Sequence, residues 1–472
     1  MSTTLILGQI LWADTTQPPQ PGWGVAIEGD RVVATAPHAD LRARFPGAAV
    51  VDAGACVITP AFVNAHHHLY GVLAHGIPVP PTDPHPCPFP YQGEGITPSP
   101  PWGEGRGEGQ SPPSSPGEKG WPFLTDFWWP RVEDRLDHDL IAAAADWACL
   151  EMVRSGVTTF YDCLEAPHAL PGALAAEADV VRRWGLRGVL SFEATERVSA
   201  ANGELGLREN VAFVDECRWR GGLVAGMMCF HTTFTCSADF IRRAYALAAE
   251  HYARIHMHLA ESSYEPQYCL ARFGLRPVVY YDRLGVLSEH VLASQCVQVD
   301  AQEIDLLARR GVHVSHQPLS NCEVGGGFAP VPELLAAGVN VALGTDGYIN
   351  NFFEVLRAAA LIPRARLLDP AAMPAPVVWT MATRNGARAL GYDDLGALHP
   401  GHQADLLLIA ADLPTPLAPH NLADQLLLWR NPADLRGVMC AGRWLLRDGQ
   451  VPGVDEAAVR DRVHQAAQRL WQ

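Results

Sequence analysis

Three consecutive histidines follow a Val/Ile-rich run and are the first candidates for chemistry in this chain. The segment VITPAFVNAHHHLYG holds them as His66, His67 and His68. Residues two apart on a strand point to the same face, so His66 and His68 would aim two imidazoles at one point while His67 turns away. Imidazole is a common metal ligand in proteins. The pair is therefore a candidate half of a metal site, although such a pair is as often packing or a chance run.

Other strand-like runs also end in residues suited to metal chemistry. The runs ARIHMHLAE, NVALGTDG, LVAGMMCFH and VHVSHQPLSN carry, in this order, His258 with Glu261, then Asp346, His231 and His316. Three imidazoles and one carboxylate form a ligand set typical of zinc or ferrous iron, with one position left for water. His256 and His258 form a second pair of the same spacing, and the spacing leaves open which of the two binds the metal.

This residue set predicts hydrolysis. A bound divalent ion lowers the pKa of its water toward neutrality. A carboxylate at the metal can take the proton of that water, and a second carboxylate nearby can hand a proton to a departing nitrogen. Asp346 and Glu261 fit these two roles. Taken singly, His231 could be a packing residue and the GTDG around Asp346 a simple turn.

Repeated strand–helix alternation supplies the scaffold that must bring these residues together. Strand-like runs are expected at 156–162, 187–194, 223–231, 253–260, 290–297, 312–317 and 340–346, and helices at 139–156, 237–252, 300–311 and 330–338. This alternation favours an α/β fold with a (β/α)8 TIM-like barrel over residues 59–396. The carboxyl ends of barrel strands converge on one face, which would gather the candidate residues there.

The two ends of the chain have a different sequence pattern. Short alternating runs with turn signals fill residues 4–58, and similar runs return after residue 397. We expect residues 1–58 and 397–472 to form one composite β-sandwich domain. Residues 78–120 are dominated by Pro, Gly, Ser and Glu and predict a disordered low-complexity insertion. A neutral surface insertion is favoured over a lid for this segment.

Composition excludes several classes of function. The formal net charge of the 472 residues is −16 without a basic stripe, which argues against nucleic-acid partners. The sequence has no apolar run of membrane-spanning length and no signal-like N-terminus, so a cytoplasmic protein without membrane contact is expected. The 11 cysteines are scattered without a CxxC pair, which argues against a cysteine zinc site. The single lysine, Lys119, lies in the low-complexity segment, so a carbamylated lysine bridging two metals is not expected.

Several motifs together resemble the amidohydrolase superfamily, in its cytosine deaminase/chlorohydrolase-like branch. The resemblance covers nearly the whole chain apart from residues 78–120. The matching segments are 60–68, similar to PGxxxxHxH with Ala61 in place of Gly; 230–237, similar to PHxxYTCS with Phe230 in place of Pro; HLAE, similar to HxxE; 315–321, similar to SHNPxSN; LGTDG; and 396–405, similar to GxLxxGxxAD. FEATERV, DFWWPRVEDRLD and PTPLAPHN most resemble the SsnA group of aminohydrolases.

The resemblance implies a metal-dependent hydrolase of carbon–nitrogen bonds other than peptide bonds. Its substrate would be a small molecule, most simply a purine-, pterin- or triazine-like heterocycle that loses an amino group. One divalent ion, zinc or alternatively iron, would be held by four residues, namely His66, His68, His258 and Asp346. Glu261 would shuttle the proton, and His231 and His316 would contact substrate. Whether the protein forms a homo-oligomer is left open by the resemblance.

One position departs from the resemblance. In HVLASQCVQVD, Gln295 stands where the family has a histidine beside the metal water. Glutamine can donate a hydrogen bond but cannot carry a charge or a proton, and the loss of one such group typically costs about 10²–10³ in rate. Gln295 stays a candidate catalytic residue, and three alternatives follow: the mechanism depends more on Glu261, the substrate differs, as in a ring-opening amidohydrolase or chlorohydrolase, or the chain is a catalytically impaired metal-binding homologue. The substrate-selecting candidates without an assigned role are Glu165, Glu193, Arg197, Asn321 and Asn350.

Overall fold

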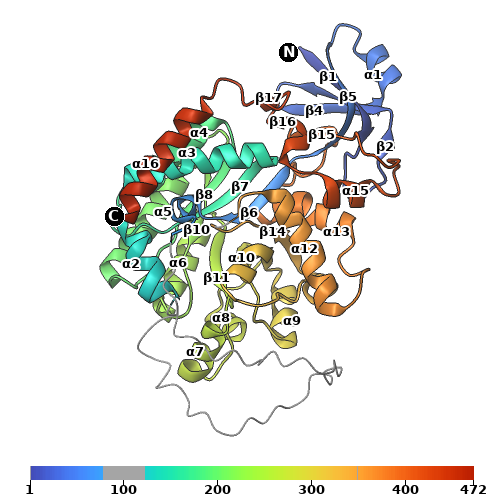
Figure 1. Cartoon of the computed structure of the whole chain (residues 1–472). Helices are drawn as coiled ribbons and strands as arrows, with labels where there is room; N and C mark the ends of the chain where they lie inside the picture. The colour runs from blue at the N-terminus through green and yellow to red at the C-terminus, as the bar shows by residue number, and fades with distance from the viewer. Residues whose placement is uncertain (1, 78–122, 348) are drawn as a thin grey trace, which may run out of the picture.

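The computed structural model describes residues 2–77, 123–347 and 349–472. The predicted insertion at 78–120 lies outside these described residues. Within them the chain forms a mixed α/β structure (Figure 1), as the strand–helix alternation predicts. No described helix is both long enough and apolar enough to cross a bilayer.

An eight-stranded sheet joins the two ends of the chain. Its strands are β1 (Thr3–Leu11), β2 (Gln20–Pro21), β3 (Trp23–Glu28), β4 (Arg31–Pro37), β5 (Ala49–Pro60), β15 (Leu406–Ala410), β16 (Leu435–Cys440) and β17 (Arg443–Arg447). The order is β17-β16-β15-β5-β1-β3-β4, with β2 paired to β1. The N- and C-terminal segments meet where β5 and β15 pair antiparallel, with Ile58 opposite Leu408.

Alternation along β1 buries both faces of this sheet. Leu5 and Leu7 pack with Leu41 of α1 (His38–Arg44), whereas Ile6 lies in a second cluster with Ile58 and its neighbours. Successive side chains of a strand point to opposite faces, which explains this division. A hairpin turn at residues 28–31 (EGDR) joins β3 to β4.

Nine parallel strands form two further sheets. One has the order β6 (Phe62–His67), β7 (Val157–Leu164), β8 (Arg187–Phe192), β9 (Ala225–Gly226), and the other β10 (Met228–Cys229), β11 (Ile255–Leu259), β12 (Val291–Gln295), β13 (His313–His316), β14 (Asn340–Leu343). Two parallel bridges connect these sheets, Ala194 with Phe230 and His67 with Asp346. All eight residues of β7 are buried, as is typical of parallel strands covered on both faces.

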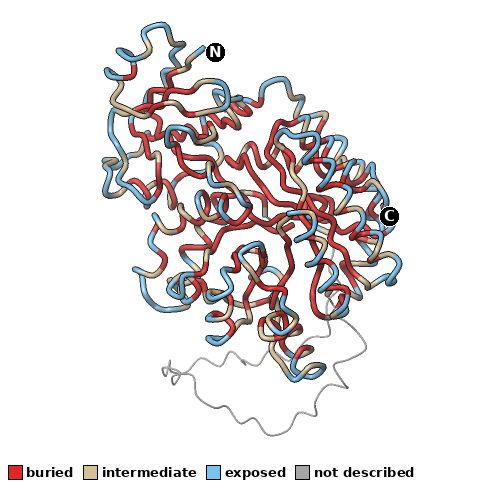
Figure 2. The backbone as a smooth tube through the Cα atoms, turned by 180° about the vertical axis from the view of Figure 1, so that it is seen from behind, coloured by how far each residue is buried: buried red, intermediate tan, exposed pale blue. Residues whose placement is uncertain are grey.

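Helices lie between and around the parallel strands. The longer ones are α3 (His138–Ser155), α4 (Ala173–Trp184), α5 (Ala200–Arg220), α6 (Ala238–Glu250), α7 (Tyr264–Phe273), α8 (Pro277–Leu284), α9 (Ala301–Arg310) and α12 (Phe352–Leu367). Further helices and helical turns are η1 (Leu69–Ala74), η2 (Phe123–Trp128), α2 (Trp129–Arg131), η3 (Glu133–Arg135), α10 (Pro318–Glu323), α11 (Val331–Ala336), α13 (Ala375–Thr380), η4 (Met381–Asn385), α14 (Gly386–Ala389), α15 (Leu422–Trp429) and η5 (Pro432–Asp434). Buried positions gather on the central strands and exposed ones on the outer helices (Figure 2).

Local sequence explains where the longer helices begin and end. The side chain of Asp137 accepts a hydrogen bond from the Leu140 amide at the start of α3, and Gly156 ends the helix in the left-handed conformation. Asp300 and Glu303 form a reciprocal capping box at the start of α9. Such caps satisfy amides and carbonyls that have no partner inside the helix.

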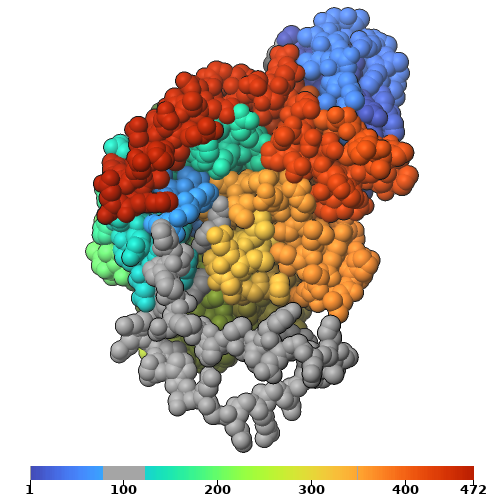
Figure 3. Space-filling model, in the orientation of Figure 1, coloured from blue at the N-terminus to red at the C-terminus, as the bar shows by residue number. Residues whose placement is uncertain are grey.

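The last helix, α16 (Glu456–Trp471), lies on α3 rather than on the eight-stranded sheet. Arg154 pairs with Glu456, and the Trp471 indole donates to the Leu73 carbonyl at 2.7 Å. Figure 3 shows the C-terminal segment as a continuous red band across one face of the molecule. The predicted range 397–472 therefore includes a helix that packs against the parallel-strand part.

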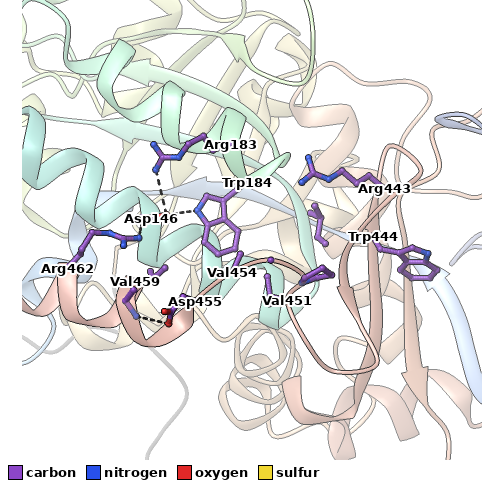
Figure 4. Close-up of a pocket in the computed structure, with 14 residues that line it drawn as sticks. Asp146, Arg183, Trp184, Arg443, Trp444, Val451, Val454, Asp455, Val459 and Arg462 are labelled. Atoms are coloured by element: carbon purple, nitrogen blue, oxygen red, sulfur yellow. Dashed lines mark hydrogen bonds and ion pairs between the residues drawn. The ribbon is translucent and has the colours of Figure 1, made fainter.

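A cavity of about 270 Å³ lies where this C-terminal segment meets α3 and α4 (Figure 4). The Trp184 indole donates to Asp146 at 2.7 Å, and the guanidinium groups of Arg462 and Arg183 also turn toward this carboxylate. The residues that line this cavity thus bind one another, which indicates that they hold the C-terminal segment against α3 and α4.

A buried ion pair joins the eight-stranded sheet to β8. Arg187 is 2% exposed, and its Nη1 lies 2.6 Å from Oδ2 of Asp405, which is 5% exposed. The same guanidinium donates to Gln403 at 2.8 Å and to Thr159 at 3.0 Å. Asp405 also accepts from the Ala441 amide at 2.8 Å. All these partners are required because a buried charge without them is strongly unfavourable.

We expect Asp405→Ala to lower the free energy of unfolding by about 3–5 kcal/mol, because it leaves the Arg187 charge buried and unpaired. Urea unfolding followed by circular dichroism measures this change. Asp305→Ala, which breaks an exposed pair with Arg309 on α9, should change it by less than about 0.5 kcal/mol. Equal effects of the two substitutions would contradict the assigned role of the buried pair.

Candidate metal centre

Three of the predicted histidines converge at the ends of β6 and β11. The nearest ring nitrogens of His66, His68 and His258 all lie within 4.8 Å of one another, and the three side chains are buried. Neither ring nitrogen of His66 has a hydrogen-bond partner among the described residues. Burial and the neighbouring imidazoles lower the pKa of His66 well below its usual value. A neutral imidazole with free nitrogens in a buried cluster is what a metal ligand requires.

Hydrogen bonds orient two of the adjacent histidines. His68 Nδ1 contacts the Cys163 carbonyl, so Nδ1 is the donor and Nε2 keeps its lone pair. This Nε2 lies 3.6 Å from Oδ1 of Asp346. His67 turns the other way, with its Nδ1 on the Asp346 carbonyl and 3.1 Å from the Thr345 hydroxyl. His67 thus holds the backbone of the residue that carries the candidate carboxylate.

The structure separates His256 from His258. His256 Nε2 lies 2.5 Å from the Ser294 hydroxyl, and its Nδ1 lies 3.3 Å from the Cys229 sulfur, so both nitrogens have partners. His258 Nδ1 instead lies 2.8 Å from Oε1 of Glu193, and neither of these buried atoms has a partner with hydrogen-bond geometry. His258 is therefore the histidine of this pair that remains available to a metal.

Asp346 lies three residues beyond the end of β14, in the left-handed conformation with φ 61°. Its Oδ2 accepts from Gln295 Nε2 at 2.7 Å and from the Ser320 hydroxyl at 2.8 Å, while Oδ1 accepts from the Gly347 amide at 2.7 Å. These donors hold the carboxylate in one orientation beside His68.

Gln295 links Asp346 to a second amide. Its Nε2 donates to Asp346, and its Oε1 accepts from Asn321 Nδ2. The Asn350 amide donates to Glu151 at 2.6 Å instead. Of the two asparagines without an assigned role, Asn321 thus reaches the centre through Gln295.

Glu261 lines the same cavity as His68, His258 and Asp346. Burial raises the pKa of Glu261 to about 8, and the nearby Asp346 carboxylate adds to the shift. A carboxyl group with this pKa carries a proton at neutral pH and can donate it.

The two histidines predicted to contact substrate lie in different places. His231 lines the cavity, with its Nδ1 3.0 Å from the Thr235 hydroxyl and its Nε2 3.8 Å from Glu193 Oε1. Burial lowers the pKa of His231 to about 3, so the ring is neutral. His316 is buried at the end of β13 and is not among the described residues that line the cavity.

Residues that the sequence analysis did not single out complete the cavity. Tyr70, Trp129 and Glu133 line it, together with Glu165 and Glu193. The Tyr70 hydroxyl donates to Glu133 at 2.8 Å. The only sequence signal for Glu133 and Trp129 was their place within DFWWPRVEDRLD, which carried a resemblance but no role.

The sequence of the chain matches known protein families and relatives. Residues 57–445 match the Amidohydrolase family, and residues 24–48 match the imidazolonepropionase-like composite domain of bacteria. A 5-methylthioadenosine/S-adenosylhomocysteine deaminase of Syntrophobacter fumaroxidans is 31% identical over 99% of this chain and 98% of its own. A 5'-deoxyadenosine deaminase of Methanothermobacter thermautotrophicus is 36% identical over 74% of this chain and 81% of its own.

Solved structures show the same fold. A zinc-bound adenosine deaminase from Xanthomonas campestris superposes with a TM-score of 0.83 at 24% identity, over 99% of this chain and 98% of that one. The atrazine chlorohydrolase TrzN from Arthrobacter aurescens gives 0.79 at 20% identity, over 98% and 100%. The family match spans most of the chain, and relatives above 30% identity cover nearly all of it. The chain belongs to the amidohydrolase family.

Proposed function

We propose that this protein is a metal-dependent aminohydrolase that removes an amino group from a heterocycle, most simply an adenosine-like compound. The observation that carries the proposal is the cluster of His66, His68 and His258, of which His68 and His258 line one cavity together with Asp346 and Glu261. The named activities of the deaminase relatives support the adenosine-like substrate class. The two bridges between the parallel sheets support a closed (β/α)8 barrel carrying a composite β-sandwich.

The metal site of the proposal consists of His66, His68, His258 and Asp346. The unpartnered nitrogens of His66 and the free Nε2 of His68 fit a divalent ion, and the nitrogen-rich donor set favours zinc, with ferrous iron as the alternative. When bound, such an ion lowers the pKa of water toward neutrality. Glu193 lies 2.8 Å from His258 Nδ1, where a carboxylate can accept the N–H and orient the ring.

Proton transfer falls to the two carboxyl groups. Asp346 is positioned by three donors and accepts a proton from the attacking water. Glu261, with its pKa raised to about 8, delivers a proton to the departing nitrogen. The neutral ring of His231 orients substrate, and the amide of Gln295 positions the Asp346 carboxylate. A direct substrate contact of Gln295, which is not among the described residues that line the cavity, stays a prediction. A substrate contact of His316 stays a prediction.

Asp346→Asn should abolish hydrolysis while the fold is retained, because an amide cannot take the water proton. Zinc-loaded protein is assayed for ammonia release over adenosine-like, pterin and triazine compounds, with circular dichroism as the check on folding. Asp305→Asn on the exposed face of α9 is the matched control. Full activity of Asp346→Asn would rule out the proposal, and release of halide without ammonia would favour a chlorohydrolase.

Glu193→Gln should weaken metal binding by about 10–100-fold, the usual effect of removing the carboxylate that orients a ligating histidine. Competition with a chromophoric chelator measures the affinity for zinc. Glu204→Gln, on the surface of α5, should leave it unchanged. An unaltered affinity in Glu193→Gln would exclude this role of the carboxylate.

Gln295→His should lower kcat/KM for ammonia release by about 10²-fold, the typical effect of one lost preorganised group. The reason is that Gln295 donates to Asp346 and accepts from Asn321 at the same time. The assay uses saturating zinc, with Gln302→His on the exposed face of α9 as control. A large gain would instead mean that the natural chain is an impaired homologue.

A further inference from the structure

The cavity has an unusual charge balance. Its described lining contains five carboxyl groups and neither arginine nor lysine. Asp346 and Glu261 belong to the proposed metal chemistry. Glu133, Glu165 and Glu193, the last of which also contacts the proposed metal ligand His258, form what we call the acid wall. Each of these three is at least 96% buried.

One cation stands behind the acid wall, and its hydrogen-bonding groups are already occupied. The Arg197 guanidinium donates from Nε to Glu165, from Nη1 to Asp134 at 2.8 Å and from Nη2 to Glu133 at 3.2 Å. Its other contact is the Trp129 ring, whose centroid lies 4.7 Å away. One positive charge thus faces three carboxyl groups, with Glu193 as a fourth nearby.

The acid wall is therefore under-neutralised. Buried carboxylates without enough counter-charge either take up protons or bind a cation. Burial raises the pKa of Glu165 to about 7 and that of Glu133 well above its usual range. Glu193 lines the cavity without any contact to Arg197, and its Oε1 lies 2.8 Å from His258 Nδ1 and 3.8 Å from His231 Nε2.

Aromatic rings stand beside these carboxyl groups. Tyr70 and Trp129 line the cavity together with the acid wall. Aromatic faces attract cations and exclude water, and both effects strengthen a charge pair with a carboxylate. The combination of flat rings and excess carboxylates is complementary to a planar or amine-bearing cation.

We propose that the cavity selects a heterocyclic substrate that carries a positive charge, an ammonium or amidinium group seated against the acid wall. This inference rests on the proposed function, since the charged group is placed relative to the carbon attacked at the metal centre. Neutral analogues would bind less tightly, and an anionic group at the same place would be rejected by the like charges.

Benzamidine and benzamide test the inference directly. The two molecules have nearly the same shape, but only benzamidine is cationic at neutral pH. Titration calorimetry on the zinc-loaded enzyme should show benzamidine binding at least about ten-fold more tightly than benzamide, with an affinity that falls as salt is added. Equal or weaker binding of benzamidine, or binding of neither compound, would overturn the inference.

Glu165→Gln identifies the group responsible. It should weaken benzamidine binding about ten-fold and leave benzamide binding unchanged, whereas Glu204→Gln on the surface should change neither. An unchanged preference in a folded Glu165→Gln variant would overturn the assignment to the acid wall. Should that variant fail to fold, Glu133→Gln replaces it, and the preference of the unaltered enzyme still decides the charge selectivity.

Turnover separates this inference from the proposed function. If both hold, 5'-amino-5'-deoxyadenosine should give a kcat/KM for ammonia release at least about ten-fold above that of 5'-deoxyadenosine. Ammonia release that favours the neutral nucleoside overturns the charge selectivity and keeps the proposed function. A preference for benzamidine without ammonia release from any tested heterocycle overturns the proposed function and keeps the charge selectivity.

Discussion

The contact between β6 and the end of β14 is the constraint on which the candidate site depends. The His66 carbonyl accepts from the amides of both Thr345 and Asp346 at 3.1 Å. Asn64 reinforces the contact, since its amide donates to the Thr345 hydroxyl at 2.7 Å. A Cβ on Gly344 would stand 2.8 Å from the His66 carbonyl oxygen, so this close approach requires glycine. β6 and β14, the first and last of the parallel strands, thereby place their candidate ligands side by side.

The charges of the cavity are the second feature that determines what the site can bind. The metal centre offers buried nitrogens and a fixed carboxylate, which together suit a divalent cation. The acid wall lies in the same cavity and keeps more negative charge than Arg197 balances. A buried site with these two features binds cations at two places, one for the ion and one for a group on the substrate. The charge distribution, rather than the fold, would then distinguish this enzyme from relatives on the same scaffold.

Much of the fold and part of the site followed from local sequence rules. Strand periodicity placed His66 and His68 on one face and His67 on the other, and the strand–helix alternation predicted helices at 139–156 and 300–311, close to the observed α3 and α9. Spacing could not separate His256 from His258, because both lie on the same face and differ only in depth, which is set by Ser294 and Cys229 on other strands. Glu133 and Glu165 meet only through tertiary packing, so no local pattern predicts the acid wall. The pattern after residue 397 predicted only short β runs, whereas Glu456–Trp471 form the helix α16, which packs on α3.

Gln295 departs from the family pattern, and its surroundings hold it firmly in place. Gln295, Cys296 and Asp346 all adopt the left-handed conformation although none is glycine, with φ of 78°, 48° and 61°. Such residues typically cost about 1–3 kcal/mol each and persist where the surroundings hold them. The Gln295 side chain uses its donor on Asp346 and its acceptor on Asn321, and Asn321 lies on α10 beside Ser320, which also binds Asp346. A residue retained only by chance after loss of function has no reason to fill both ends of its amide in a strained turn. The network therefore argues that glutamine is part of a working site, in which the carboxylate is oriented by neutral donors and the charge is carried elsewhere in the cavity.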